Sequence, residues 1–199
     1  LFALKGLRGW NVAGLLANRP RTGAAVVAAL CALIAGIATP LVFEGYTLSL
    51  DEFMADFDAR ILRAGELMAL IPGSWRDFAP ALAPLYTLQT ADNTHWASSY
   101  LPLNAAFRAV AGLIGAADWM NPVWAGVSIV ALYGVGRRLW PDRSGPALAA
   151  TVLMATSAQF LIMAMTSYAM SAHLALNLVW LWLFLRGGRW GNAGAIAVA

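Results

Sequence analysis

The sequence predicts an all-α fold, that of a polytopic helical membrane protein in which one large loop carries surface helices. Composition is the first reason: 60% of the 199 residues are hydrophobic and 12% are charged, whereas soluble domains are about 45–50% apolar and about 25% charged. The second reason is a set of apolar segments close to the length of about 20 residues that crosses a bilayer. The net charge of +3 is too small to hold a phosphate backbone, so we expect no nucleic-acid partner.

Four segments have the length and apolarity of membrane spans, at 24–43, 122–140, 146–165 and 168–185. A fifth begins near residue 193 and reaches the end of the sequence. Because the chain begins at Leu1 and ends inside an apolar run, we expect residues 1–199 to be the N-terminal part of one membrane domain.

The segment at 101–117 is apolar but holds Arg108 near its middle, where a charge costs at least about 2.5–3.5 kcal/mol in a bilayer. If this segment lies on the outer face instead of crossing, nine of the 13 basic residues share one side of the membrane, which the positive-inside rule makes cytoplasmic. The nine are Lys5, Arg8, Arg19, Arg21, Arg137, Arg138, Arg143, Arg186 and Arg189. We therefore expect an integral protein of a bacterial inner (plasma) membrane. Its N-terminus would be cytoplasmic, and residues 44–121 would form one outer loop.

This outer loop is the expected place of any site chemistry, because long ordered loops usually carry function. Ser49 and Glu52 form the N-terminal signature of a helix that would run to about Leu70. Asp51 and Glu52 lie in its first turn, where carboxylates meet the positive end of the helix dipole. Both carboxylates could simply cap the helix. Alternatively, Glu52 serves the cap and Asp51, just beyond the first span, is a catalytic base.

The predicted helix has an apolar face and a polar face. Phe53, Phe57 and Ile61 recur at helical spacing on the first. On the second, Asp56 and Arg60 are four residues apart, which predicts an ion pair between them.

The Asp51-Glu52 pair also begins a longer pattern. The next part of the pattern is an outer helix introduced by Tyr100-Leu101-Pro102-Leu103. A span that ends in Gly136-Arg137-Arg138-Leu139-Trp140 follows. The pattern closes with the stretch 149–157 and a span that ends in Leu183-Phe184-Leu185-Arg186. This order, over roughly Thr22 to Arg189, resembles the N-terminal half of the GT-C membrane glycosyltransferases. It is most similar to the group of protein mannosyltransferases and lipid A aminoarabinose transferases.

The resemblance implies an enzyme that takes a sugar from a polyprenyl-phosphate carrier on the periplasmic or lumenal side. The sugar passes, with inversion, to a protein, lipid or glycan acceptor, and Asp51 occupies the position of the family's general base. Two other classes stay open: a transporter or flippase for a lipid-linked glycan, and a non-catalytic membrane assembly subunit. A transporter should carry ionisable residues near the midplane of its spans, and only His173 comes close to that.

The sequence departs from the family pattern at two places. Ser99 and Tyr100 stand where the aminoarabinose branch has an acidic residue and a lysine. The link at 165–170 has no acid, whereas many members carry an aspartate there. The sequence therefore leaves open the donor sugar, the acceptor and the use of a divalent cation.

Two histidines have competing explanations. Asp92 and His95 in the outer loop form either a proton-handling or metal-binding pair or a solvated turn. His173 either hydrogen-bonds Gln159 across a hairpin of two spans or reaches the catalytic cavity. The tryptophans of this region are expected to anchor the membrane interface rather than to bind sugar; they are Trp75, Trp96, Trp119 and Trp124.

Overall fold

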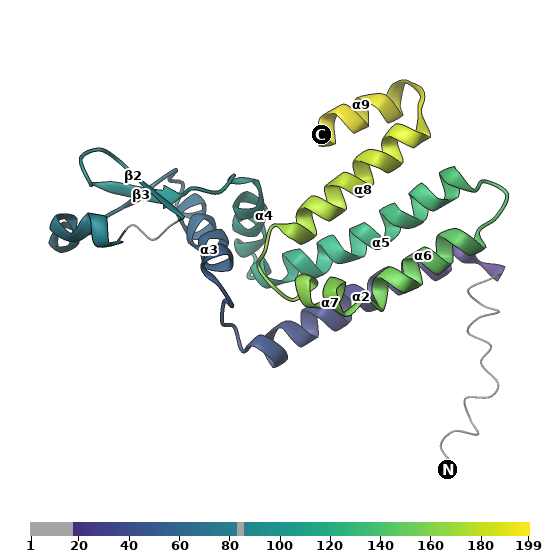
Figure 1. The fold of residues 1–199 in the computed structure, drawn as a ribbon, viewed down its shortest axis with the longest axis horizontal. Helices are drawn as coiled ribbons and strands as arrows, with labels where there is room; N and C mark the ends of the chain where they lie inside the picture. Colours follow the sequence, from purple (N-terminus) through teal and green to yellow (C-terminus); the bar gives the residue numbers. More distant parts are fainter. Residues whose placement is uncertain (1–17, 83–85) are drawn as a thin grey trace, which may run out of the picture. The chain divides into compact units, whose positions relative to one another are not determined.

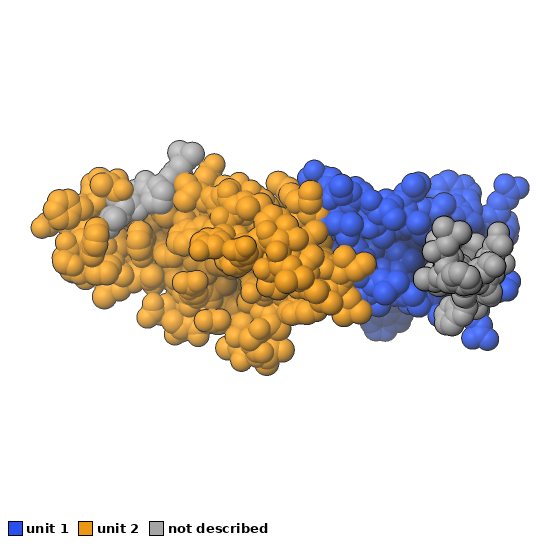
Figure 2. Space-filling view, turned by 90° about the horizontal axis from the view of Figure 1, so that it is seen from below, with its two compact units in different colours: residues 1–32, 125–161, 174–199 blue, residues 33–124, 162–173 orange. Residues whose placement is uncertain are grey.

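The computed structural model describes residues 18–82 and 86–199, and their fold is mostly helical, as expected, with one small sheet (Figure 1). The chain divides into two compact units, coloured separately in Figure 2. The first comprises residues 1–32, 125–161 and 174–199, and the second comprises residues 33–124 and 162–173.

The apolar segments predicted as spans are all helical. They correspond to α2 (Pro20–Phe43), α5 (Met120–Leu139), the pair α6 (Gly145–Ala155) and α7 (Ala158–Ala164), α8 (Met170–Arg186) and α9 (Gly188–Val198). In the described part of the chain, α2 alone is long and apolar enough to cross a bilayer as a single helix, with a mean hydropathy of 2.5. The pair α6 and α7 would add a second crossing if it is one broken span, while α8 is apolar but has 17 residues.

The predicted span at 146–165 is not one continuous helix, because α6 and α7 meet at an angle of 63°. Two hydroxyl residues at the break explain the bend. The Thr156 hydroxyl donates to the Val152 carbonyl at 2.9 Å, which satisfies the end of α6. The Ser157 hydroxyl accepts the Phe160 backbone N–H at 3.5 Å, at the start of α7.

In the first unit, α5 packs closely on its neighbours through small residues. Tyr133 of α5 forms a buried cluster with Ala24 of α2 and Ala147 of α6. Gly136 lies so close to Ala147 that a Cβ at this position would collide with it. Small residues at such crossings allow backbones to approach, which is a common way to join helices in membranes.

In the second unit, α3 (Leu50–Arg63) packs against α4 (Leu103–Gly112). Ala59 of α3 meets Ala105 and Ala109 of α4, with Leu62 beside them. The predicted extension of this first helix to Leu70 was wrong.

A glycine ends α3 early. Gly65 has a φ of 79°, and its N–H bonds the Leu62 carbonyl while the Glu66 N–H bonds the Ile61 carbonyl. These two bonds form a Schellman motif, in which glycine supplies the left-handed residue at low cost.

The sheet was not predicted. It has the order β1-β3-β2 and is antiparallel, with β1 at Ala69–Leu70, β2 at Thr87–Gln89 and β3 at His95–Ser98. Strands of two to four residues are too short to show a clear alternation of apolar and polar side chains. Two 3₁₀ segments complete this unit, η2 (Gly73–Leu82) and η3 (Ala117–Trp119).

Candidate active site

Glu52 connects the N-terminus of α3 to the preceding residue segment and to a distant link of the chain. Its carboxylate is buried, with 2% of the residue exposed. One oxygen accepts the Leu48 backbone N–H at 2.6 Å, and the other accepts the Ser167 backbone N–H at 2.7 Å. The expectation that the Ser49 side chain caps the helix was wrong. The Ser49 hydroxyl instead accepts the hydroxyl of Tyr168 at 2.7 Å.

Asp51 differs from its neighbour in both exposure and bonding. It is partly exposed, and one of its oxygens accepts the hydroxyl of Tyr100 at 2.9 Å. Within residues 18–82 and 86–199, its second oxygen has no hydrogen-bond partner. Asp51 therefore has a free acceptor atom beside a tyrosine hydroxyl, while both oxygens of Glu52 are engaged.

Tyr100 is a firmly neutral hydrogen-bond donor. Partial desolvation, followed by the hydrogen bond to Asp51 and that carboxylate's charge, raises the pKa of Tyr100 to about 12. Tyr86 packs against it with ring centroids 5.4 Å apart. Tyr86 and Tyr168 also contribute to the raised pKa, so both lie within electrostatic range of Tyr100.

The link between α7 and α8 is fixed to this site by four side chains. Besides the bonds from Glu52 and Ser49 described above, Asn104 donates to the Ser167 carbonyl at 3.2 Å and Asn121 donates to the Tyr168 carbonyl at 2.8 Å. Each of these two asparagines also has a buried Oδ1 atom, which could accept a hydrogen bond but has no partner among the described residues. The link lacks the acid sought in the sequence, and it brings Tyr168 to the start of α3 instead.

A small pocket of about 210 Å³ adjoins Tyr100 and contains a carboxylate that the sequence analysis did not single out. Asp58 lines it together with Ser98, Leu62 and Pro102. The carboxylate is 9% exposed and accepts the Ser98 backbone N–H at 2.9 Å. Burial raises the pKa of Asp58, against the lowering effect of the Ser98 hydrogen bonds. The signal was present in the sequence, since residues seven apart, such as 51 and 58, share a helix face.

Asp92 and His95 belong to a turn. Asp92 accepts the Thr94 backbone N–H at 3.2 Å and the Thr94 hydroxyl at 2.8 Å, and that hydroxyl lies 2.8 Å from the His95 ring. Hydrogen bonds from Thr90 and Thr94 lower the pKa of Asp92 to about 2. The described residues contain no group of three His, Cys, Asp or Glu side chains suited to a metal. These bonds are those of the predicted turn, and the proton-handling or metal-binding role stays a prediction.

His173 has an exposed side chain. It belongs to the second unit and Gln159 to the first, so the hydrogen bond between them stays a prediction.

Three of the four tryptophans pack on the protein. Trp96 contacts Phe57 and Trp124 contacts Phe107, both edge to face. Trp119 lies against Gly36 of α2, where a Cβ would collide with its ring. Trp75 is 53% exposed and is free to anchor an interface.

Comparisons with models of protein families, with curated proteins and with solved structures find no match for this chain.

Proposed function

We propose that this chain is the N-terminal part of an integral membrane glycosyltransferase, and that Asp51 is its general base. The donor is a sugar on a polyprenyl phosphate, the acceptor is a hydroxyl of a protein, lipid or glycan, and transfer takes place on the outer face of a bacterial inner membrane. The proposal rests on the resemblance described above and on the geometry of the second unit. The proposal also puts the N-terminus in the cytoplasm, because nine of the 13 basic residues then share the cytoplasmic side.

The surface of α2 supports the membrane part of the proposal. Only 22% of its most apolar stretch is buried within the protein. Leu30, Ile34 and Ile37 are each more than half exposed. A core helix of a soluble protein would bury such side chains, whereas a bilayer accepts them.

The observation that carries the catalytic part is the different bonding of the two adjacent carboxylates. Glu52 is buried and uses both oxygens to hold backbone N–H groups. Asp51 is partly exposed, and one of its oxygens has no hydrogen-bond partner among the residues that the structure describes. A general base needs an accessible acceptor in a fixed position, and Asp51 meets both conditions.

In the proposed reaction, Asp51 takes the proton of the acceptor hydroxyl as that oxygen attacks the anomeric carbon of the sugar. The bond between this carbon and the phosphate oxygen breaks at the same time, and its electron pair leaves with the polyprenyl phosphate. Attack from the side opposite the leaving group inverts the anomeric centre. The Tyr100 hydroxyl holds the carboxylate in place by donating to its other oxygen.

The test is sugar transfer by the full-length protein in liposomes, with a polyprenyl-phosphate sugar as donor and expression matched between variants. Asp51→Asn keeps the size of the side chain and should lower transfer by about 10²–10⁴-fold, the range for loss of a general base. Asp77→Asn is the matched control, because Asp77 is exposed and lies outside the site, and it should retain normal transfer. Full transfer by Asp51→Asn would show that Asp51 is not the general base, and its role would then be confined to the start of α3.

A further inference from the structure

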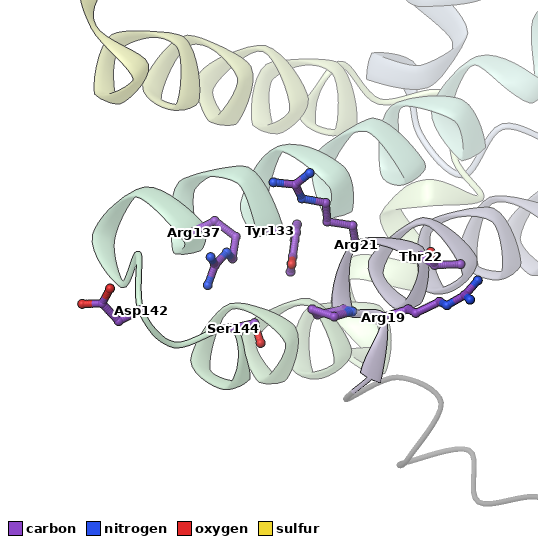
Figure 3. Close-up of a pocket in the computed structure, with 8 residues that line it drawn as sticks. Arg19, Arg21, Thr22, Tyr133, Arg137, Asp142 and Ser144 are labelled. Carbon is purple, nitrogen blue, oxygen red and sulfur yellow. The ribbon is translucent and has the colours of Figure 1, made fainter.

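The first unit contains a second feature, a pocket of about 440 Å³ at the end of its helices, lined by residues of this unit (Figure 3). Its walls come from the start of α2, the end of α5 and the loop that leads into α6. Pockets that hold small molecules begin at about 300 Å³, so this one has room for a phosphate group and part of its ester.

The pocket is rich in positive charge. Arg19, Arg21 and Arg137 line it, against one carboxylate, Asp142. None of the three arginines forms an ion pair within the described parts of the chain. Figure 3 shows the carboxylate of Asp142 turned outward from the loop. Three cations without protein counter-ions favour an anion from outside.

Arg137 is held in position for this role. Its guanidinium donates to the Pro141 carbonyl at 2.7 Å and to the Trp140 carbonyl at 3.4 Å. Figure 3 shows Arg137 and Tyr133 projecting from α5 toward Ser144 at the start of α6. An arginine that is already oriented loses less entropy when it binds an oxyanion.

The independent observation is a buried hydroxyl that has nothing to bond. Tyr133 is 8% exposed, and its hydroxyl has no hydrogen-bond partner in the part of the chain that the structure describes. Its ring is fixed between Ala24 and Ala147, and it lines the pocket. Leaving such a group unpaired costs about 1–3 kcal/mol, which a ligand that accepts its hydrogen bond would recover.

The start of α6 adds further donors. Ser144 is the N-cap residue, lines the pocket, and makes no side-chain capping bond. Its hydroxyl and the N–H groups of Gly145 and Ala147 have no intrahelical partner, whereas Pro146 has no N–H. These donors lie at the end where the helix dipole is positive.

We propose that this pocket binds a phosphate group, held by Arg21, Arg137, the Tyr133 hydroxyl and the start of α6. Two sources share this chemistry, the headgroup of an anionic phospholipid and free inorganic phosphate. The site is independent of the acidic pair in the second unit and of the proposed sugar transfer.

The test measures binding to the full-length protein in a neutral detergent by native mass spectrometry and by thermal stabilisation. One arm titrates inorganic phosphate, and the other titrates micelles doped with phosphatidylglycerol against phosphatidylcholine. Saturable binding in the first arm identifies free phosphate, and saturable binding in the second arm alone identifies the lipid. The absence of saturable binding in both arms would overturn the proposal.

The variants distinguish binding in this pocket from non-specific attraction of an anion by the positively charged surface. Tyr133→Phe removes only the unpaired hydroxyl, so the unliganded protein should be as stable as the parent or more so, while affinity falls about 10-fold. Arg137→Gln should weaken binding at least as much. Arg138→Gln is the matched control, since Arg138 is adjacent, exposed and outside the pocket. Equal loss with Arg138→Gln, or unchanged affinity with Tyr133→Phe, would contradict the site.

Discussion

Glu52 is a buried carboxylate with two backbone donors, one from the residue Leu48 and one from the distant Ser167. Glutamine at this position can accept only one of them, and its NH₂ group then faces the other N–H. We expect Glu52→Gln to lower the free energy of unfolding by about 1–3 kcal/mol, the cost of a buried donor left unpaired. Denaturant or thermal unfolding in detergent measures this.

Glu66→Gln provides the comparison for Glu52→Gln. Glu66 is exposed, and its carboxylate has no partner among the described residues. Its substitution should change the unfolding free energy by less than about 0.5 kcal/mol. If the two variants unfold alike, the bonds of Glu52 do not hold the link at Ser167 against α3.

Asp58 should make stability depend on pH. Burial raises the pKa of its carboxyl above the ordinary value of 3.8, so the folded state binds the proton more tightly than the unfolded state. Stability is therefore lost as the pH rises from 3.8 through the raised pKa. Asn cannot ionise, and it can still accept the Ser98 N–H.

We thus expect Asp58→Asn to be at least as stable as the parent at neutral pH, and to lose this advantage below pH 3.8. Melting temperatures of both proteins across the acidic and neutral range measure the difference, in which the effects of other carboxylates cancel. A variant that is less stable than the parent at neutral pH, and only there, would show that the Ser98 hydrogen bond needs the charge of Asp58.

The packing of α3 on α4 depends on one arginine. Arg108 is 2% exposed, and its guanidinium donates to one Asp56 oxygen at 2.9 and 2.5 Å and lies 3.4 Å from Asp118. The sequence suggested that Asp56 pairs with Arg60 on its own helix, and this was wrong. Two N–H groups of the buried Arg108 donate to the same Asp56 oxygen, and this charge-assisted contact between helices is favoured over an exposed pair four residues apart.

We expect Arg108→Gln to cost about 3 kcal/mol of unfolding free energy. This is the low end for a broken buried pair, because the Asp56 side chain is itself 30% exposed. Arg60→Gln, at an exposed position, should cost no more than about 0.5 kcal/mol. Unfolding of the two variants under the same conditions decides between the contact with Arg108 and the pair predicted with Arg60.

These elements also show how far the sequence could be interpreted. Long apolar runs predicted α2 and α5 well, because apolarity over many residues is a local signal. The end of α3 was misplaced although Gly65 stood in the sequence, because the apolar spacing continued through Met68. The engagement of Glu52 with backbone N–H groups could be anticipated from the capping signature, whereas the role of Asp51 stays a prediction.

The partners of these carboxylates could not be anticipated. Tyr100 lies 49 residues from Asp51, and Ser167 lies 115 residues from Glu52. Helical periodicity describes which face a side chain takes, and it carries no information about which distant segment packs there. The link at 165–170 looked deficient because it has no acid, yet it supplies the Ser167 backbone and the Tyr168 hydroxyl to this site.

Orientation across the membrane is the property that depends on the whole chain. Nine of the 13 basic residues lie at the N-terminal end or in the segments around 137–143 and 186–189. The loop at 44–121 holds nine of the ten acidic residues. Since lysine and arginine are retained on the cytoplasmic side, Ser99 in this loop and Gly145 at the start of α6 should face opposite sides.

Cysteine labelling can test this orientation directly. Cys31, the single cysteine, is buried at 3% exposure, so Cys31→Ala gives a background without reactive thiols. In that background, Ser99→Cys should react with a membrane-impermeant thiol reagent added to intact cells, because residue 99 is exposed and the proposed orientation puts the loop at 44–121 outside. Gly145→Cys, where a side chain meets no neighbour within 4 Å, should react only after the cells are permeabilised. Labelling of both cysteines in intact cells would place both segments outside. The segment around Arg108 and α5 would then either both cross the membrane or both stay on one side, and the predicted orientation would be wrong.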